Sequence, residues 1–131
     1  MNITVDTNVL VRAVMMDDAV QARAAKHILM ESQSIAVTLP CLCEFVWVLA
    51  KVYELSNQEI AESIRLLLNL ASVRSNRPAV EAGLIALDNN QDFADAVISF
   101  EGTQLGGEIF VSFDKSAVRF LQSQKQKTLL L

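Results

Sequence analysis

A short β-prone run passes directly into a helical pattern at Ile3-Thr4-Val5-Asp6-Thr7-Asn8. Its first three residues are of types that favour strands. Apolar residues then recur at the spacing of a helix, at Val9, Leu10, Ala13 and Val14. The run Ile109-Phe110-Val111-Ser112-Phe113-Asp114 has the same form and is the clearest strand pattern in the chain. Both runs predict a strand that ends in an acid, at the point where a helix begins.

Further strands are predicted between the other helices. Weaker β patterns cover residues 34–38, 72–75 and 128–131. Helical patterns cover residues 18–29, 40–53, 56–68, 78–87, 92–104 and 115–121. Strands that alternate with helices imply βαβ units and a parallel sheet between layers of helices. The sequence therefore predicts the α/β class: a three-layer α/β/α single domain over residues 1–131, with a mainly parallel central sheet.

The composition favours a folded cytoplasmic protein. Of the 131 residues, 52% are apolar and 20% are charged, so a sizeable core is expected and disorder is not. The N-terminal residues show no signal-peptide pattern, and no apolar run approaches the ~20 residues of a membrane helix. Cys41 and Cys43 lack a second cysteine pair or a nearby histidine, which favours buried thiols in a reducing cytosol over a disulfide or zinc site. We expect no membrane partner.

The net charge of −4 is a weak argument against a nucleic-acid substrate. Five acids are candidates for one metal pocket, and without them the rest of the chain is slightly basic: Asp6, Glu44, Asp92, Asp95 and Asp114. Arginine and lysine side chains elsewhere in the sequence remain to flank a phosphate backbone.

Asp6 and Asp114 follow predicted strands. In open parallel sheets, ligands bind beyond the carboxyl ends of the strands. Both acids are therefore placed to reach such a crevice. An Asp after a strand is also a common helix cap, and for either residue alone the two interpretations stay open.

Glu44 is the only charged residue between Cys41 and Ala50, in a helix that is apolar on all sides. A carboxylate in that setting is expected to be shielded from water. An unpaired buried ion is costly, so it should bind a cation or protonate. Pairing with a structural partner such as Arg12 is the alternative.

Asp92 and Asp95 are one helical turn apart and share a face of their helix. Asp92 stands near the helix start, where a cap is its expected role, while Asp95 lies deeper and is the better ligand. Several converging carboxylates repel one another unless a cation such as Mg²⁺ or Mn²⁺ compensates them. A metal held in this way can activate water for attack on a phosphate. His27, the only histidine, is interpreted as a helix-surface residue, so a Ser-His-Asp site is not expected.

Four segments together resemble the motifs of PIN-domain proteins, in the right order and over almost the whole chain. They are Asp6-Thr7-Asn8-Val9-Leu10-Val11-Arg12, Glu44-Phe45-Val46-Trp47-Val48-Leu49, Asp92-Phe93-Ala94-Asp95-Ala96-Val97-Ile98 and Val111-Ser112-Phe113-Asp114. Small PIN domains of this length look most like the VapC toxins of bacterial toxin–antitoxin pairs. The resemblance implies a Mg²⁺- or Mn²⁺-dependent endoribonuclease that cleaves RNA, is usually a homodimer and is silenced by a cognate antitoxin protein.

Carried over by position, the resemblance implies an acidic quartet as catalytic and metal-binding residues: Asp6, Glu44, Asp95 and Asp114. Asp92 would be auxiliary, and Thr7 and Ser112 would supply hydroxyls near the metal or the scissile phosphate. Some relatives have a further acid just after the fourth motif, where Lys115-Ser116 stand here. This departure bears on whether a second metal position exists.

Three other functions remain open. A phosphatase of the haloacid dehalogenase type needs a second acid two residues after the first, where this chain has Asn8. A phospho-accepting receiver domain, also Mg²⁺-dependent, needs paired acids near its first strand, and the run 3–6 offers one. A non-catalytic PIN-like binding module is the third. If the toxin interpretation holds, the large apolar residues of the helix over 42–53 exceed one core-facing stripe, which predicts a surface for self-association or for the antitoxin.

Overall fold

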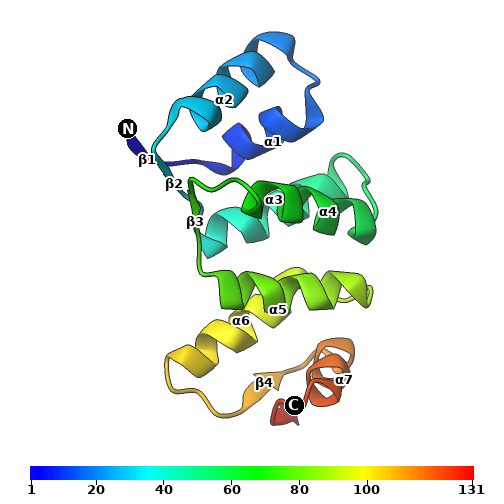
Figure 1. Cartoon of the computed structure of the whole chain (residues 1–131). Coiled ribbons are helices and arrows are strands. Elements are labelled where there is room, and N and C mark those ends of the chain that lie inside the picture. The colour runs from blue at the N-terminus through cyan, green and yellow to red at the C-terminus, as the bar shows by residue number, and fades with distance from the viewer. The chain divides into compact units, whose positions relative to one another are not determined.

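The computed structural model describes all residues, 1–131, and alternates helices with short strands (Figure 1). The strands are β1 (Asn2–Thr4), β2 (Ser34–Ala36), β3 (Val73–Arg74), β4 (Phe110–Ser112) and β5 (Thr128–Leu130). The helices are α1 (Thr7–Met15), α2 (Ala19–Glu31), α3 (Leu39–Lys51), α4 (Asn57–Leu68), α5 (Arg77–Asp88), α6 (Phe93–Gln104) and α7 (Lys115–Ser123). Every predicted helix and strand is present, with ends shifted by a few residues.

The chain divides into two compact units, Met1–Asn76 and Arg77–Leu131. In the first unit the strands form a three-stranded sheet in the order β1-β2-β3, and in the second β4 pairs with β5. Every pair is parallel. The prediction of an α/β fold with parallel strands is therefore confirmed.

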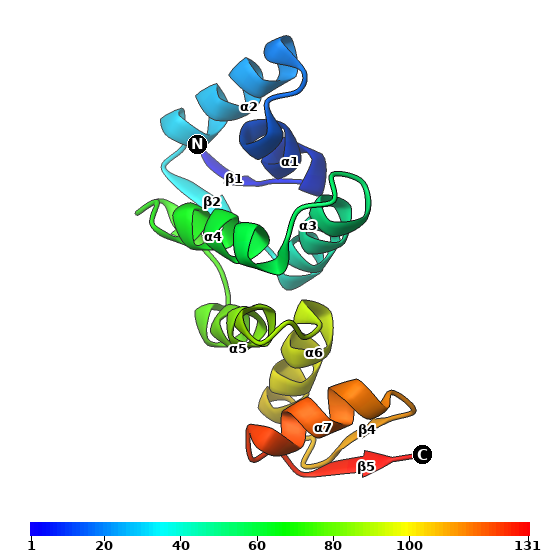
Figure 2. The same ribbon diagram turned by 90° about the vertical axis from the view of Figure 1, so that its right-hand side faces the viewer.

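The first unit is layered around its sheet. The central strand β2 carries Ile35, which is fully buried and pairs in register with Ile3 on one side and Val73 on the other. Figures 1 and 2 show α1 and α2 on one side of the strands and α3 and α4 on the other. Phe45 and Ile60 fill the core from the α3 and α4 side. The layers follow from burial, since a parallel strand must be covered on both faces.

Local signals place the helix starts in this unit. The Oδ1 of Asp18 accepts a hydrogen bond from the Gln21 N–H at 3.0 Å and caps α2. The predicted capping box of α4 is formed by Ser56 and Glu59, which bond each other's backbone N–H groups at 3.1 and 3.0 Å. Such caps typically stabilise a helix by about 1 kcal/mol each.

The second unit rests on a close crossing of α5 and α6. Gly83 of α5 faces the buried ring of Phe93, and a Cβ added at Gly83 would lie 2.4 Å from the ring's Cε2 atom. Glycine is therefore required for the two helices to approach this closely. Figure 2 shows α7 alongside the β4–β5 pair, and Ala117, Val118 and Leu121 are the buried residues of α7.

No helix in the structure is both long enough and apolar enough to cross a lipid bilayer.

Candidate active site

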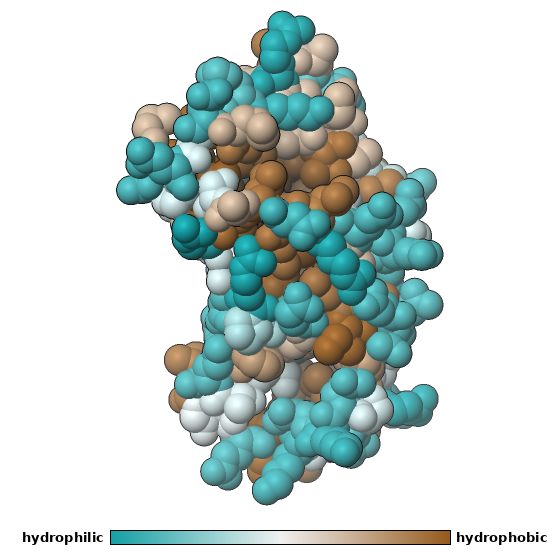
Figure 3. Space-filling model, viewed as in Figure 1, coloured by the Kyte–Doolittle hydropathy of each residue, from teal (hydrophilic) through white to brown (hydrophobic).

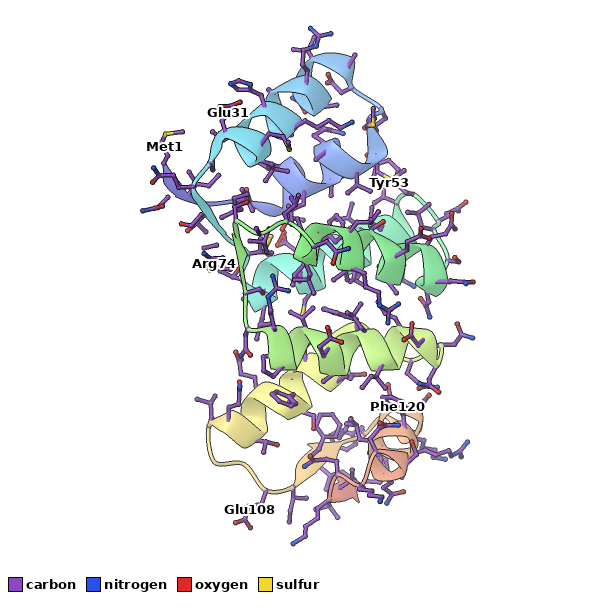
Figure 4. The ribbon with its side chains drawn as sticks, in the orientation of Figure 1. Met1, Glu31, Tyr53, Arg74, Glu108 and Phe120 are labelled. Carbon is purple, nitrogen blue, oxygen red and sulfur yellow. The ribbon has the colours of Figure 1, made fainter.

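Three of the predicted acids line one cavity in the second unit. This acid cavity has a volume of about 120 Å³ and is lined by Asn90, Gln91, Asp92, Asp95, Asp114, Ser116, Ala117, Phe120 and Leu121. Phe120, labelled in Figure 4, contributes apolar wall from α7. The acids come from the first turn of α6 and from the residue before α7, so two helix N-termini border the cavity. Partial positive charge at helix N-termini favours anionic groups there.

Asp92 and Asp95 have different roles in α6. Asp92 is the N-cap, and its Oδ1 accepts a hydrogen bond from the Asp95 N–H at 2.9 Å. Asp95 is half-buried in the first turn. Burial raises the pKa of the Asp95 carboxyl, and the negative charges of Asp92 and Asp114 raise it further. Asp95 thus has two acidic neighbours and no ion pair within the chain.

Asp114 is fixed by a short turn at the end of β4. Its Oδ1 accepts hydrogen bonds from the N–H groups of Ser116 at 2.9 Å and Ala117 at 3.1 Å, which caps α7. Its own N–H donates to the hydroxyl of Ser112 at 2.9 Å. In this structure Ser112 thus helps to orient the backbone of Asp114.

A neutral hydrogen bond crosses the wall of the acid cavity. The Ser116 hydroxyl donates to Oε1 of Gln91 at 3.1 Å, which joins the loop before α6 to the first turn of α7. In the sequence, Ser116 stands close to where some relatives have a further acid, and Gln91 lies in the polar stretch Asn89-Asn90-Gln91. No sequence periodicity links residues 25 positions apart, so this contact was not predictable from either residue alone.

The first unit contributes Asp6 and Glu44. Asp6 is the exposed N-cap of α1, and its Oδ1 accepts a hydrogen bond from the Thr7 N–H at 2.8 Å. Glu44 lies on α3. The pKa of the Cys41 thiol is raised mainly by burial, and the charges of both Asp6 and Glu44 raise it further. The negative charges of Asp6 and Glu44 therefore both affect the Cys41 thiol.

The prediction that Glu44 is shielded from water is wrong. The side chain is exposed, because α3 turns Leu42, Phe45 and Leu49 into the core. The apolar residues around Glu44 in the sequence are distributed over more than the core-facing side of the helix. An exposed carboxylate does not need a partner in the chain, so its chemistry cannot be inferred from burial.

Arg12 is not the partner of Glu44. Its guanidinium donates to Asp17 at 3.1 Å and to Gln21 at 2.6 Å, and it meets the Tyr53 hydroxyl at 3.4 Å. Tyr53, labelled in Figure 4, in turn donates to Asp17 at 2.8 Å. This network ties α1, the start of α2 and the segment after α3 together.

Thr7 is buried, and its hydroxyl reaches the Cys41 carbonyl at 3.5 Å and the Cys41 Sγ at 3.8 Å. The structure therefore directs this hydroxyl toward α3. Cys41 is buried as predicted, and neither it nor Cys43 forms a disulfide. His27, the lone histidine, is exposed on α2, in agreement with its interpretation as a helix-surface residue.

In neither unit do three or more His, Cys, Asp or Glu side chains form a group that could hold a metal ion. The acid cavity nevertheless suits a hard cation by its chemistry. Mg²⁺ takes oxygen ligands, keeps several waters and usually needs only one or two carboxylates from the protein. Asp95 and Asp114 line the same cavity and make no ion pair with any lysine or arginine. Burial raises the pKa of Asp95 most, and a divalent cation would relieve the repulsion from Asp92 and Asp114 that raises it further.

The second unit thus has carboxylates at a strand end and at two helix starts, and carboxylate oxygens are the ligands that hard divalent cations prefer. Residues 3–120 match the PIN domain family, and the chain belongs to that family. PIN domains are generally metal-dependent nucleases, which act as hydrolases on nucleic acid and use divalent metal ions. The matched range contains all four acidic motifs. No curated protein matches the chain.

Proposed function

We propose that this chain is an endoribonuclease that depends on Mg²⁺ or Mn²⁺ and hydrolyses RNA phosphodiesters. The acidic quartet supplies the metal-binding and catalytic carboxylates: Asp6, Glu44, Asp95 and Asp114. The auxiliary residues are Thr7, Asp92 and Ser112. The observation that carries the proposal is the acid cavity, where Asp92, Asp95 and Asp114 stand without a cationic partner in a chain of the PIN family.

We also propose that residues 1–131 act as one nuclease domain. The support is the family match, which runs through both compact units from residue 3 to residue 120. Half of the acidic quartet lies in each unit, so neither unit alone carries all four motifs.

The chain's own residues supply a fixed arrangement of negative charge. Asp92 and Asp114 are anchored as helix caps, and Asp95 is held in the first turn of α6. A bound divalent ion supplies activation of water and neutralisation of charge on the attacked phosphate. In the first unit, the carboxylates of Asp6 and Glu44 are exposed.

We further propose that the chain is the toxin of a toxin–antitoxin pair. It would form a homodimer, and a cognate antitoxin protein would suppress its activity. The support for this role is exposed apolar surface on α3, where Trp47 is 58% exposed, while Phe45 on the same helix is buried. Val52, just after α3, is also exposed. Figure 3 shows apolar side chains gathered on the face in view, over the first unit. Exposed apolar residues that form a contiguous surface usually serve a partner. An antitoxin arginine is the expected group to pair with the quartet, because a guanidinium binds carboxylates bidentately.

RNA cleavage by the purified chain tests the nuclease. Cleavage of a labelled oligoribonucleotide is expected with Mg²⁺ or Mn²⁺, and it should be lost in excess chelator and in the Asp95→Asn protein. The Asp18→Asn protein is the matched control, because Asp18 caps α2 outside the candidate site. RNA binding without cleavage would instead support a binding module. Hydrolysis of a small phosphate monoester without RNA cleavage would support a phosphatase.

Expression in cells tests the toxin role separately. The chain alone should arrest growth, and co-expression with a neighbouring gene's product should restore growth and suppress RNA cleavage. Harmless expression of a chain that cleaves RNA in vitro would contradict the toxin role and leave the nuclease standing.

A further inference from the structure

Gln91 lines the acid cavity, and its backbone is fixed by a hydrogen bond to α5. Its N–H donates to the Ala86 carbonyl at 2.7 Å, which ties it to the last turns of α5. The preceding residue, Asn90, has a φ of 55°, in the left-handed region that asparagine tolerates better than most residues. The turn therefore fixes where the Gln91 side chain starts, and that side chain lines the cavity together with Asp92, Asp95 and Asp114.

The amide of Gln91 is also oriented. Its Oε1 accepts the hydrogen bond of the Ser116 hydroxyl at 3.1 Å, and Ser116 is itself held because its N–H donates to Asp114. A glutamine amide presents one accepting and one donating arm, so a fixed Oε1 also fixes the NH₂ group. Carboxylates on the same cavity favour this orientation, because they repel a carbonyl oxygen and attract an N–H. The NH₂ group makes no hydrogen bond within the chain.

We propose that Gln91 is a phosphate-binding residue and that Ser116 is its positioning residue. The Gln91 NH₂ group donates a hydrogen bond to a non-bridging oxygen of the RNA phosphate at the acid cavity, and the Ser116 hydroxyl keeps the amide turned for that bond. This inference rests on the proposed nuclease function. It adds a neutral contact to the substrate in a site otherwise lined by acids.

A neutral donor at position 91 suits a cavity that is lined by negatively charged side chains. A lysine or arginine at position 91 would pair with Asp92, Asp95 or Asp114 and compete with a metal ion for them. An amide donates to an anionic oxygen without that competition, and a hydrogen bond to a charged group is worth more than one between neutral groups. Gln91 can thus bind phosphate while the carboxylates remain available to the cation.

The decisive variant is Gln91→Glu. Glutamate has the same length and keeps an oxygen to accept from Ser116, so the contact between the loop before α6 and the first turn of α7 is retained. It replaces the NH₂ donor by an oxygen that repels phosphate. Gln122→Glu is the matched control, because Gln122 is exposed on α7, lies outside the acid cavity and gains the same charge.

Two binding measurements separate phosphate binding from metal binding. Calorimetry with adenosine 5′-monophosphate, which has no phosphodiester to cleave, reports phosphate affinity in the presence of Mn²⁺. Electron paramagnetic resonance reports Mn²⁺ affinity. For Gln91→Glu we expect nucleotide affinity to fall about ten-fold or more and Mn²⁺ affinity to stay equal or increase. Nucleotide affinity within about two-fold of the unaltered protein, or a parallel loss of Mn²⁺ affinity, would overturn the inference. Gln122→Glu should change neither quantity.

Ser116 is tested by removal and rescue of its hydroxyl. Ser116→Ala should weaken nucleotide binding by a smaller factor, because the amide stays but is no longer oriented, and Ser116→Thr should restore it. If Ser116→Ala binds the nucleotide as the unaltered protein does, the positioning role is wrong. If the unaltered protein neither binds Mn²⁺ nor cleaves RNA, the proposed function itself fails. If it does both while Gln91→Glu has no effect, only this inference fails.

Discussion

Replacing Asp114 by Asn and by Ala should separate helix capping from metal binding. The Oδ1 of Asp114 accepts two backbone hydrogen bonds that cap α7, from Ser116 and Ala117. Asparagine keeps an oxygen for both bonds and loses the negative charge, whereas alanine loses the bonds and the charge. Both variants should lose RNA cleavage, by more than the roughly 10- to 100-fold that is typical when a partner outside the metal's own ligands is removed. Only the alanine variant should lose substantial stability.

The stability difference follows from the cap. Replacing an Asp N-cap by Ala typically costs about 1 kcal/mol, with a range of about 0.5–2 kcal/mol. In a chain of this length that cost lowers the melting temperature by about 3–6 °C. The asparagine variant loses a favourable charge at a helix N-terminus, worth about 0.3–1 kcal/mol at exposed sites. It also relieves repulsion of Asp95, so its melting temperature should stay within about 2 °C of the original.

Circular dichroism during heating and RNA cleavage with Mn²⁺ measure the two effects. Asp18 provides the matched pair, because it caps α2 through Gln21 and lies outside the candidate site. Asp18→Ala should lose a comparable amount of stability, and neither Asp18 variant should lose cleavage. Full cleavage by Asp114→Asn would refute the assignment of Asp114 as a metal ligand. A melting temperature as low for Asp114→Asn as for Asp114→Ala would refute the separation of the two roles.

Three further predictions concern stability and reactivity. Burial and neighbouring carboxylates raise the pKa of Asp95, so the metal-free folded protein holds that proton more tightly than the unfolded chain does, and its stability falls as pH rises through that pKa. Asp95→Asn should therefore raise the melting temperature of metal-free protein at neutral pH, with a gain that disappears in acid; no gain at pH 7 would contradict this. Gly83→Ala should lower the free energy of unfolding in urea by about 1–2 kcal/mol, because the cost of the overlap between its Cβ and the Phe93 ring exceeds the gain in helix propensity. Equal stability would mean that α5 and α6 can move apart to admit the methyl group. A thiol reagent should modify half-buried Cys43 before buried Cys41, whose thiol pKa is raised by burial, and equal rates would contradict the packing of α3.

The helices and strands were predictable because their signals are local. The capping box of Ser56 and Glu59, and the cap at Asp18, depend on residues three positions apart, which the sequence displays directly. The strand run ending at Asp114 combines β-prone residues with a capping acid, and the structure ends β4 two residues before it. The division into two compact units was not visible, since no linker or change in composition marks residues 76–77.

The sequence showed which acids belong to the candidate site, but it showed less of their exposure and their hydrogen bonds. Asp92, Asp95 and Asp114 were singled out by position, and the structure has them line one cavity. The exposure of Glu44 was wrongly predicted, because apolar neighbours in sequence do not show which side of a helix meets solvent. The bond between Gln91 and Ser116 was missed because it joins the loop before α6 to the first turn of α7, and its geometry depends on how α5, α6 and α7 pack.

The capping geometry of Asp114 has a consequence for ion selectivity. Two backbone N–H groups occupy the acceptor positions of its Oδ1, which leaves Oδ2 as the oxygen open to an ion. A carboxylate restricted to one oxygen suits the compact octahedral shell of Mg²⁺. Ca²⁺ has a larger shell of six to eight oxygens, which carboxylates often help to fill by binding through both oxygens. In the proposed metal site, binding of Ca²⁺ through both oxygens of Asp114 would compete with the two hydrogen bonds that cap α7, so the cap of this helix would favour the smaller cation.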